Sequence, residues 1–281
     1  MTATPHDVHP GLAGLHRLAV DLATEGARIA REMRAEGVDI AARKSSVADI
    51  VTVADRTVEA AIRRELARVR PDDGFLGEES TATGSRSGLT WVVDPIDGTV
   101  NYAYGLPWWA VSVAVVEGDP DPATWTGLAG AVVNPLAGET WEAALGAGAR
   151  LNGRVLHLDK QVDLARTLLG TGFGYRADRR LEQGKVVGRM LGVVRDIRRL
   201  GAASLDICAV AAQRLDAYYE TGLNPWDIAG AMVVAREAGV HIGGLNGDGP
   251  GRGFFLASNP VVAGPLEEAL LAAGAEPWDG R

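Results

Sequence analysis

The chain has 281 residues, 47% of them hydrophobic and 23% charged, enough to bury a sizeable core in one large domain or two tightly joined halves. The net charge of −8 argues against a nucleic-acid partner, and an acidic protein that binds an anionic substrate usually needs cations to screen its own carboxylates. The single cysteine excludes an intramolecular disulfide, and no apolar run reaches membrane-spanning length, so we expect a cytoplasmic protein without a membrane partner.

The first half of the chain mixes helices with short strands. Helical spacing of apolar residues predicts one helix over residues 11–36 and a second from Thr52 to about Val69. Thr52 and Asp55 form a capping-box pattern at the start of the second helix, so capping is one interpretation of Asp55. Residues 44–52 could form either a hairpin or a mobile loop. Apolar or alternating runs predict strands at 75–77, 109–116, 130–133 and 139–144, with a hairpin turn at 134–138.

Beyond residues 155–165 the pattern changes, and strands and helices alternate. Strands are expected at 168–170, 193–197, 217–219 and 254–257. Helices are expected at 179–191, 204–215, 225–238 and 260–273. This organisation predicts an α/β protein with an α+β subdomain over 1–155 and an α/β subdomain over 156–281. We expect the two to pack as one unit with a cleft between them.

The stretch from Trp91 to Thr99 is the most informative part of the sequence. Its β-branched residues suit a buried strand, and Pro95 and Gly98 are expected to end that strand in a turn. Such a turn would present three oxygen donors to one point, those of Asp94, the Ile96 carbonyl and Asp97. Hard oxygen ligands of this kind suit a magnesium-type cation, although an ordinary acidic turn is the alternative.

Two further acids stand at the ends of predicted elements. Glu78 follows the strand at 75–77, and Asp227 falls in the first turn of the helix that Asn224 and Pro225 begin. Asp227 could simply complement the helix dipole, which is worth about 0.3–1 kcal/mol. If all four acids converge, however, they carry more negative charge than a site tolerates without divalent cations.

Five segments, in order and spacing, resemble the signatures of the inositol monophosphatase family. They are Asp49–Asp55, Gly77–Ser80, Trp91–Asn101, Asp216–Glu220 and Trp226–Gly239. The resemblance extends over roughly residues 12–270. It implies a layered αβαβα sandwich of the sugar-phosphatase type, a homodimer, and a magnesium-dependent, lithium-sensitive phosphatase that acts on a small phosphomonoester.

The resemblance also implies a set of metal ligands and catalytic residues. Two or three Mg²⁺ ions would be held by Glu78, Asp94, the Ile96 carbonyl, Asp97 and Asp227. Thr99 and Asp55 would form a short relay that, with Glu78, orients and deprotonates a metal-bound water. The water would attack the phosphorus directly and in line, without a phosphoenzyme.

Substrate contacts follow from the same resemblance. They involve Asp97, the backbone N–H groups of Gly98 and Thr99 toward the phosphate, Ala203 against the ring, and Glu220 on the hydroxyl groups. Lys44 and Asp49 would lie on a mobile loop near an additional metal, although Lys44 could equally be a solvated loop lysine. The chain departs from the family pattern at Ala202 and over residues 172–176, which leaves the exact alcohol open.

Inositol 1-phosphate is the expected substrate, with fructose 1,6-bisphosphate, histidinol phosphate and a nucleotide 3′-phosphate as alternatives. A protein of this fold that acts mainly by binding a partner, with residual activity, is the alternative of another class. Cys208 and Arg214 formally match the C-x5-R motif of cysteine phosphatases, but residues six apart on a helix point in different directions. The spacing of Asp94 and Asp97 likewise differs from the D-x-D of aspartate-nucleophile phosphatases.

Overall fold

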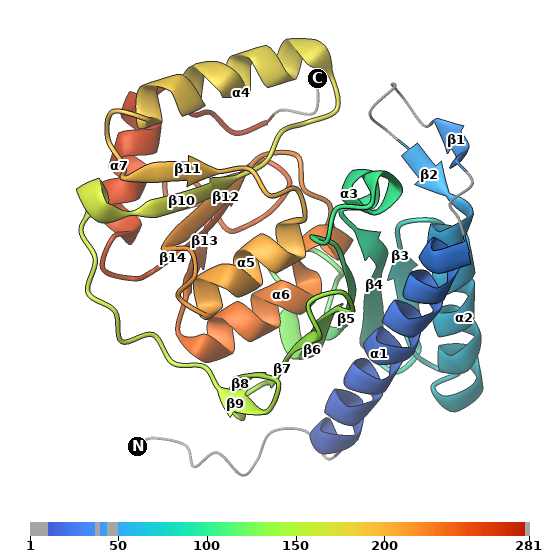
Figure 1. The fold of residues 1–281 in the computed structure, drawn as a ribbon. Helices are drawn as coiled ribbons and strands as arrows, with labels where there is room; N and C mark the ends of the chain where they lie inside the picture. The colour runs from blue at the N-terminus through green and yellow to red at the C-terminus, as the bar shows by residue number, and fades with distance from the viewer. Residues whose placement is uncertain (1–10, 37–39, 44–49, 279–281) are drawn as a thin grey trace, which may run out of the picture.

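The computed structural model describes residues 11–36, 40–43 and 50–278, so Lys44 and Asp49 lie outside the described residues. Within these ranges the chain forms five layers, in which helices and sheets alternate (Figure 1). This confirms the αβαβα sandwich. The division of the chain near residue 155 stays a prediction.

The larger sheet of the described chain has seven strands in the order β3-β4-β5-β6-β7-β8-β9. Their bounds are β3 Gly74–Gly77, β4 Leu89–Asp97, β5 Ala110–Glu117, β6 Thr126–Asn134, β7 Glu139–Ala144, β8 Gly148–Leu151 and β9 Arg154–Val155. Neighbouring strands are antiparallel, except β3 and β4, which are parallel. The paired side chains of β4 and β5 are almost all buried, because helices cover both faces of this sheet.

Helices α1 (Leu12–Glu36) and α2 (Val53–Val69) cover the outer face of the larger sheet. The buried stripe of α1 consists largely of alanines, among them Ala19, Ala23 and Ala27. Such small side chains let the helix approach the strands closely. The antiparallel strands β1 (Ile40–Arg43) and β2 (Ile50–Thr52) lie between the two helices in the chain, as the hairpin alternative requires.

Two helices, α5 (Ala203–Ala211) and α6 (Pro225–Ala238), form the middle layer and are almost entirely buried. Beyond them lies the second sheet, in which the described strands follow the order β11-β10-β12-β14-β13. Its bounds are β10 Leu168–Thr171, β11 Asp196–Arg198, β12 Ala217–Glu220, β13 His241–Gly243 and β14 Phe255–Ser258. Helices α4 (Ala177–Met190) and α7 (Ala263–Ala272) cover its outer face (Figure 1).

The prediction that Pro95 ends the central strand is wrong. Strand β4 continues to Asp97, with Asp94 opposite Ser112 and Asp97 opposite Ala110. The register shifts between these two pairs, and an irregularity of this kind tolerates proline because no ladder hydrogen bond is needed there. The chain turns only at Gly98, whose φ of 87° favours glycine. The short helix α3 (Thr99–Tyr104) follows.

Several other boundaries differ from the prediction. Helix α5 ends at Ala211 rather than Leu215, because Gln213 adopts a φ of 58° that no helix accommodates. Strand β11 begins at Asp196 rather than Val193, and α7 begins at Ala263 rather than Pro260. The sequence also failed to predict β8, β9 and β13 and the 3₁₀ turn η1 (Leu164–Arg166), which are all short. No helix in the described ranges is both long and apolar enough to cross a bilayer.

Candidate active site

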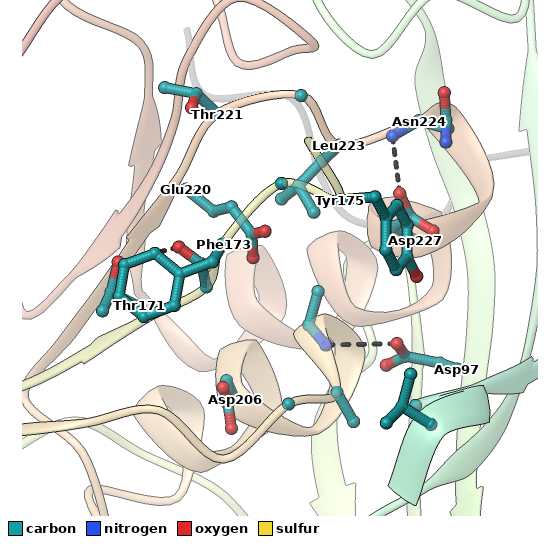
Figure 2. A pocket seen from close by; sticks show the side chains of 18 of the residues that line it. Asp97, Thr171, Phe173, Tyr175, Asp206, Glu220, Thr221, Leu223, Asn224 and Asp227 are labelled. Atoms are coloured by element: carbon teal, nitrogen blue, oxygen red, sulfur yellow. Dashed lines mark hydrogen bonds between the residues drawn. The ribbon is translucent and has the colours of Figure 1, made fainter. Parts of the chain in front are cut away.

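A cavity of about 320 Å³ lies where the end of β4 meets the beginnings of α3, α5 and α6. It brings together most of the residues that the sequence singled out: Glu78, Asp94, Ile96, Asp97, Gly98, Thr99, Ala203, Glu220 and Asp227. Asp55 does not line the cavity but hydrogen-bonds to Thr99, which does. In Figure 2, Asp97 and Asp227 lie on one side of the view, and Glu220 and Asp206 lie on the other.

Asp94 is almost fully buried in the cavity, with 1% of its surface exposed. Its Oδ1 atom has no hydrogen-bond partner among the described residues. Burial raises the pKa of Asp94 well above its ordinary value, and the charges of Glu78, Asp97 and Asp227 raise it further. An ionised Asp94 in this position requires a cation nearby.

Asp97 is held by the first turn of α5. The N–H of Ala203 donates to Oδ1 at 3.2 Å, and the N–H and hydroxyl of Ser204 donate to Oδ2 at 2.7 and 2.5 Å. Burial raises the pKa of Asp97 to about 6, although these hydrogen bonds favour the ionised form. A residue of the first half of the chain is therefore oriented by a helix of the second half (Figure 2).

Asp227 lies in the first turn of α6, as predicted, and its Oδ2 accepts a hydrogen bond of 2.6 Å from the N–H of Asn224. Asp227 and Asn224 therefore form a capping box at the start of α6, where the carboxylate also complements the helix dipole, the alternative interpretation of Asp227. The capping box does not exclude a ligand role, because a carboxylate has further lone pairs and Asp227 also lines the cavity. Burial and then the charge of Glu78 raise the pKa of Asp227 well above its ordinary value.

The Thr99 hydroxyl lies 2.9 Å from the Ile96 carbonyl and 3.5 Å from Oδ1 of Asp55. It has one proton, so it donates to one of these acceptors at a time, and the shorter contact is the stronger. The neighbours required for a relay through Asp55 are thus present, with the proton directed mainly to Ile96.

The donor chemistry of the cavity fits a hard divalent cation, since its acids are oxygen ligands and one buried carboxylate oxygen lacks a partner. In the described part of the chain, however, no three acidic, histidine or cysteine side chains are close enough together to hold a metal ion as they stand. A bound cation would therefore have to draw the carboxylates together.

Glu220 lies at the end of β12 and accepts a hydrogen bond from the Tyr218 hydroxyl. Burial raises the pKa of Glu220 to about 7, whereas the bond from Tyr218 and the charge of Arg199 lower it. Sequence reasoning missed the neighbouring Asp206, a buried acid on α5 that accepts a 3.0 Å hydrogen bond from Nε1 of Trp108. Nothing in the local sequence marks it, because its partner lies 98 residues away.

Sequence reasoning also missed three arginines and a tryptophan that line the cavity, namely Arg179, Arg199, Arg252 and Trp278. Arg176, at the end of the stretch 172–176 that departs from the family pattern, lines it too. The cysteine-phosphatase motif, in contrast, is rightly set aside. Cys208 is fully buried in α5, and Arg214 pairs with Glu139 at 2.5 and 3.0 Å.

Known proteins resemble the chain over nearly its whole length. The family model described as the inositol monophosphatase family matches residues 12–277. A Mycobacterium leprae protein named inositol-1-monophosphatase is 44% identical, over 92% of each chain. A Xylella fastidiosa protein named Nus factor SuhB is 39% identical, over 80% of this chain and 83% of that protein. The solved structure of Mycobacterium tuberculosis SuhB is 40% identical, with a TM-score of 0.78 over 95% of this chain and 98% of that one. The chain therefore belongs to the inositol monophosphatase family, a family of phosphoric monoester hydrolases.

Proposed function

We propose that the protein is a magnesium-dependent phosphatase that hydrolyses a small polyol or sugar monophosphate, inositol 1-phosphate first among them, to the free alcohol and phosphate. The observation that carries this proposal is the convergence of Glu78, Asp94, Asp97 and Asp227 on one cavity, with a buried carboxylate oxygen of Asp94 lacking a partner. The name of the Mycobacterium leprae relative supports the choice of substrate.

Each cavity residue has a role in this proposal. Glu78, Asp94, Asp97, Asp227 and the Ile96 carbonyl would hold two or three Mg²⁺ ions, which when bound lower the pKa of a coordinated water and neutralise charge on the leaving oxygen. Ser204 would keep the Asp97 carboxylate oriented through its two hydrogen bonds.

The remaining residues would handle the attacking water and the substrate. The Thr99 hydroxyl, backed by Asp55, would orient the water for in-line attack with Glu78 as the base. The N–H groups of Gly98 and Thr99 would face the phosphate, and Ala203 would contact the ring. Glu220, whose pKa of about 7 lets it either donate or accept, would bind the hydroxyl groups.

A phosphate-release assay tests the proposal. It would compare inositol 1-phosphate, fructose 1,6-bisphosphate, histidinol phosphate and a nucleotide 3′-phosphate, each with Mg²⁺ and with chelator. We expect release that depends on Mg²⁺ and is abolished by chelation. Release from none of these esters would overturn the proposal.

The Xylella fastidiosa relative is named a Nus factor, which keeps a partner-binding role as the second candidate. The four acids favour the enzyme, because a purely binding protein has no need to maintain such a costly buried cluster. From the family resemblance we further infer a cytoplasmic homodimer without nucleic-acid or membrane partners. Sedimentation equilibrium tests the dimer.

A further inference from the structure

Positive side chains line the part of the cavity around Glu220. The charges of Arg199 and Arg179 both act on Glu220 and lower its pKa, which places them near it. Arg252 lines the same cavity, as does Arg176, which pairs with Asp178. The same cavity thus combines the acids proposed as metal ligands with several arginines.

Trp278 holds two of these arginines in place. The Cζ atom of Arg179 lies 4.3 Å from the centroid of the indole ring, and that of Arg252 lies 4.5 Å from it. The backbone N–H of Trp278 donates to the Gly253 carbonyl at 2.8 Å. This bond fixes the segment after α7 beside the loop that carries Arg252. A guanidinium stacked on a ring directs its N–H groups outward in its own plane, toward planar or tetrahedral anions.

Polar contacts fix the two guanidinium groups further. Nη2 of Arg179 donates to the Thr221 hydroxyl. Nη1 of Arg252 donates to Oδ1 of Asn224 at 3.1 Å, and Asn224 begins α6, the helix that carries Asp227. The position of Arg252 is thus set relative to the proposed metal ligands.

Within residues 11–36, 40–43 and 50–278, no carboxylate forms an ion pair with Arg252. Among the described residues, neither Arg252 nor Arg199 has an acid within ion-pair distance, whereas Arg214 and Arg70 each form an ion pair. Glu220 and Asp206 are the acids on this side, and Arg199 offsets the charge of both. In a chain with a net charge of −8, an arginine at a cavity that lacks an acidic partner suits an anionic ligand.

We propose that Arg252 and Arg179, held by Trp278, form an anion-binding wall that binds a second anionic group on the alcohol part of a phosphomonoester, such as a second phosphate, and so extends the substrates of the cavity beyond inositol 1-phosphate. This inference rests on the proposed phosphatase function. Of the substrates that the sequence left open, it favours fructose 1,6-bisphosphate. It disfavours histidinol phosphate, whose amine is a cation.

The test compares kcat/KM for fructose 1,6-bisphosphate with that for inositol 1-phosphate in the magnesium-loaded enzyme. The variants are Arg252→Gln, Arg252→Lys and Trp278→Leu. Arg195→Gln, which removes the same charge from an exposed residue outside the cavity lining, is the control. We expect Arg252→Gln to lower the ratio about tenfold, mainly through KM, because a hydrogen bond to a charged group is lost. Trp278→Leu should lower the ratio as well, Arg252→Lys should lower it less, and the control should leave it unchanged.

Equal losses for both substrates in Arg252→Gln would overturn the proposal, since Arg252 would then be a structural residue. A wild-type enzyme that prefers histidinol phosphate to fructose 1,6-bisphosphate would overturn it too. If no ester is hydrolysed, the proposed function fails, and calorimetric titration of fructose 1,6-bisphosphate into the same proteins decides this inference separately. An unchanged Kd in Arg252→Gln would then refute it, and thermal unfolding of each variant checks its fold.

Discussion

Replacing Glu220 with glutamine should stabilise the metal-free protein in a way that depends on pH. Burial raises the pKa of Glu220 from 4.5 to about 7, so the folded protein binds this proton more tightly than the unfolded chain does. The stability that protonation gives is complete below about pH 4.5 and is lost as the pH rises to about 7. At about 1.4 kcal/mol for each pKa unit, the loss is about 3 kcal/mol above pH 7.

Glutamine has the same shape and stays neutral, so it can still accept the hydrogen bond from Tyr218. The assay is urea unfolding in chelator from pH 4.5 to 8, with Glu268→Gln, an exposed glutamate of α7, as the control. We expect the variant and the wild type to have similar free energies of unfolding at pH 4.5 and to diverge toward pH 7. If the free energies of unfolding of the variant and the wild type differed by the same amount from pH 4.5 to 8, the argument that burial raises the pKa of Glu220 would be refuted.

Three further predictions concern the same cavity. Asp94→Asn should lower magnesium-dependent turnover by about 100-fold or more, because a ligand charge is lost. The metal-free variant should be more stable to urea, because a buried charge among other carboxylates is removed. Near-normal turnover would contradict the proposed site. Trp108→Phe should destabilise the protein by about 1–3 kcal/mol in thermal or urea unfolding, because the buried Asp206 loses its donor, and an unchanged midpoint would count against this. Lithium at millimolar concentration should inhibit phosphate release, since a small monovalent ion can occupy a magnesium site without supplying its charge, and an insensitive enzyme would weaken the assignment to this branch of the family.

The sequence predicted the long helices well because their signals are local. Helix α6 runs over the predicted residues, with proline in its first turn and Gly239 at a φ of 92° after its end. Strand β4 shows the limit of such reasoning. Proline argues against a continued strand, but pairing with β5 on both sides of the irregularity carries the strand to Asp97. The missed strands β8, β9 and β13 contain no two adjacent large apolar residues, whereas the equally short β3, β10, β12 and β14 each do.

The site shows the same difference between local signals, which the sequence reveals, and long-range contacts, which it does not. The proposed ligands could be named because acids at element ends, and the family motifs around them, are visible in short stretches of sequence. Asp206, Arg252 and Trp278 could not be named, because their partners are distant in the chain. Nothing near Trp278 in the sequence indicates that its ring contacts Arg179, about 100 residues earlier.

Asp97 shows why the cavity depends on both halves of the chain. The carboxylate belongs to β4, but all of its described hydrogen-bond donors belong to α5, more than 100 residues later. In α3, which follows β4, Nδ2 of Asn101 donates to the Leu200 carbonyl at 2.9 Å, so a further bond joins the chain after β4 to the loop before α5. If the middle layer of helices moved away from the larger sheet, Asp97 would lose its donors, and its burial would no longer be compensated. The orientation of a proposed metal ligand and the packing of α5 on the sheet are therefore one structural property, and a substitution that loosens that packing should affect the site before it unfolds the protein.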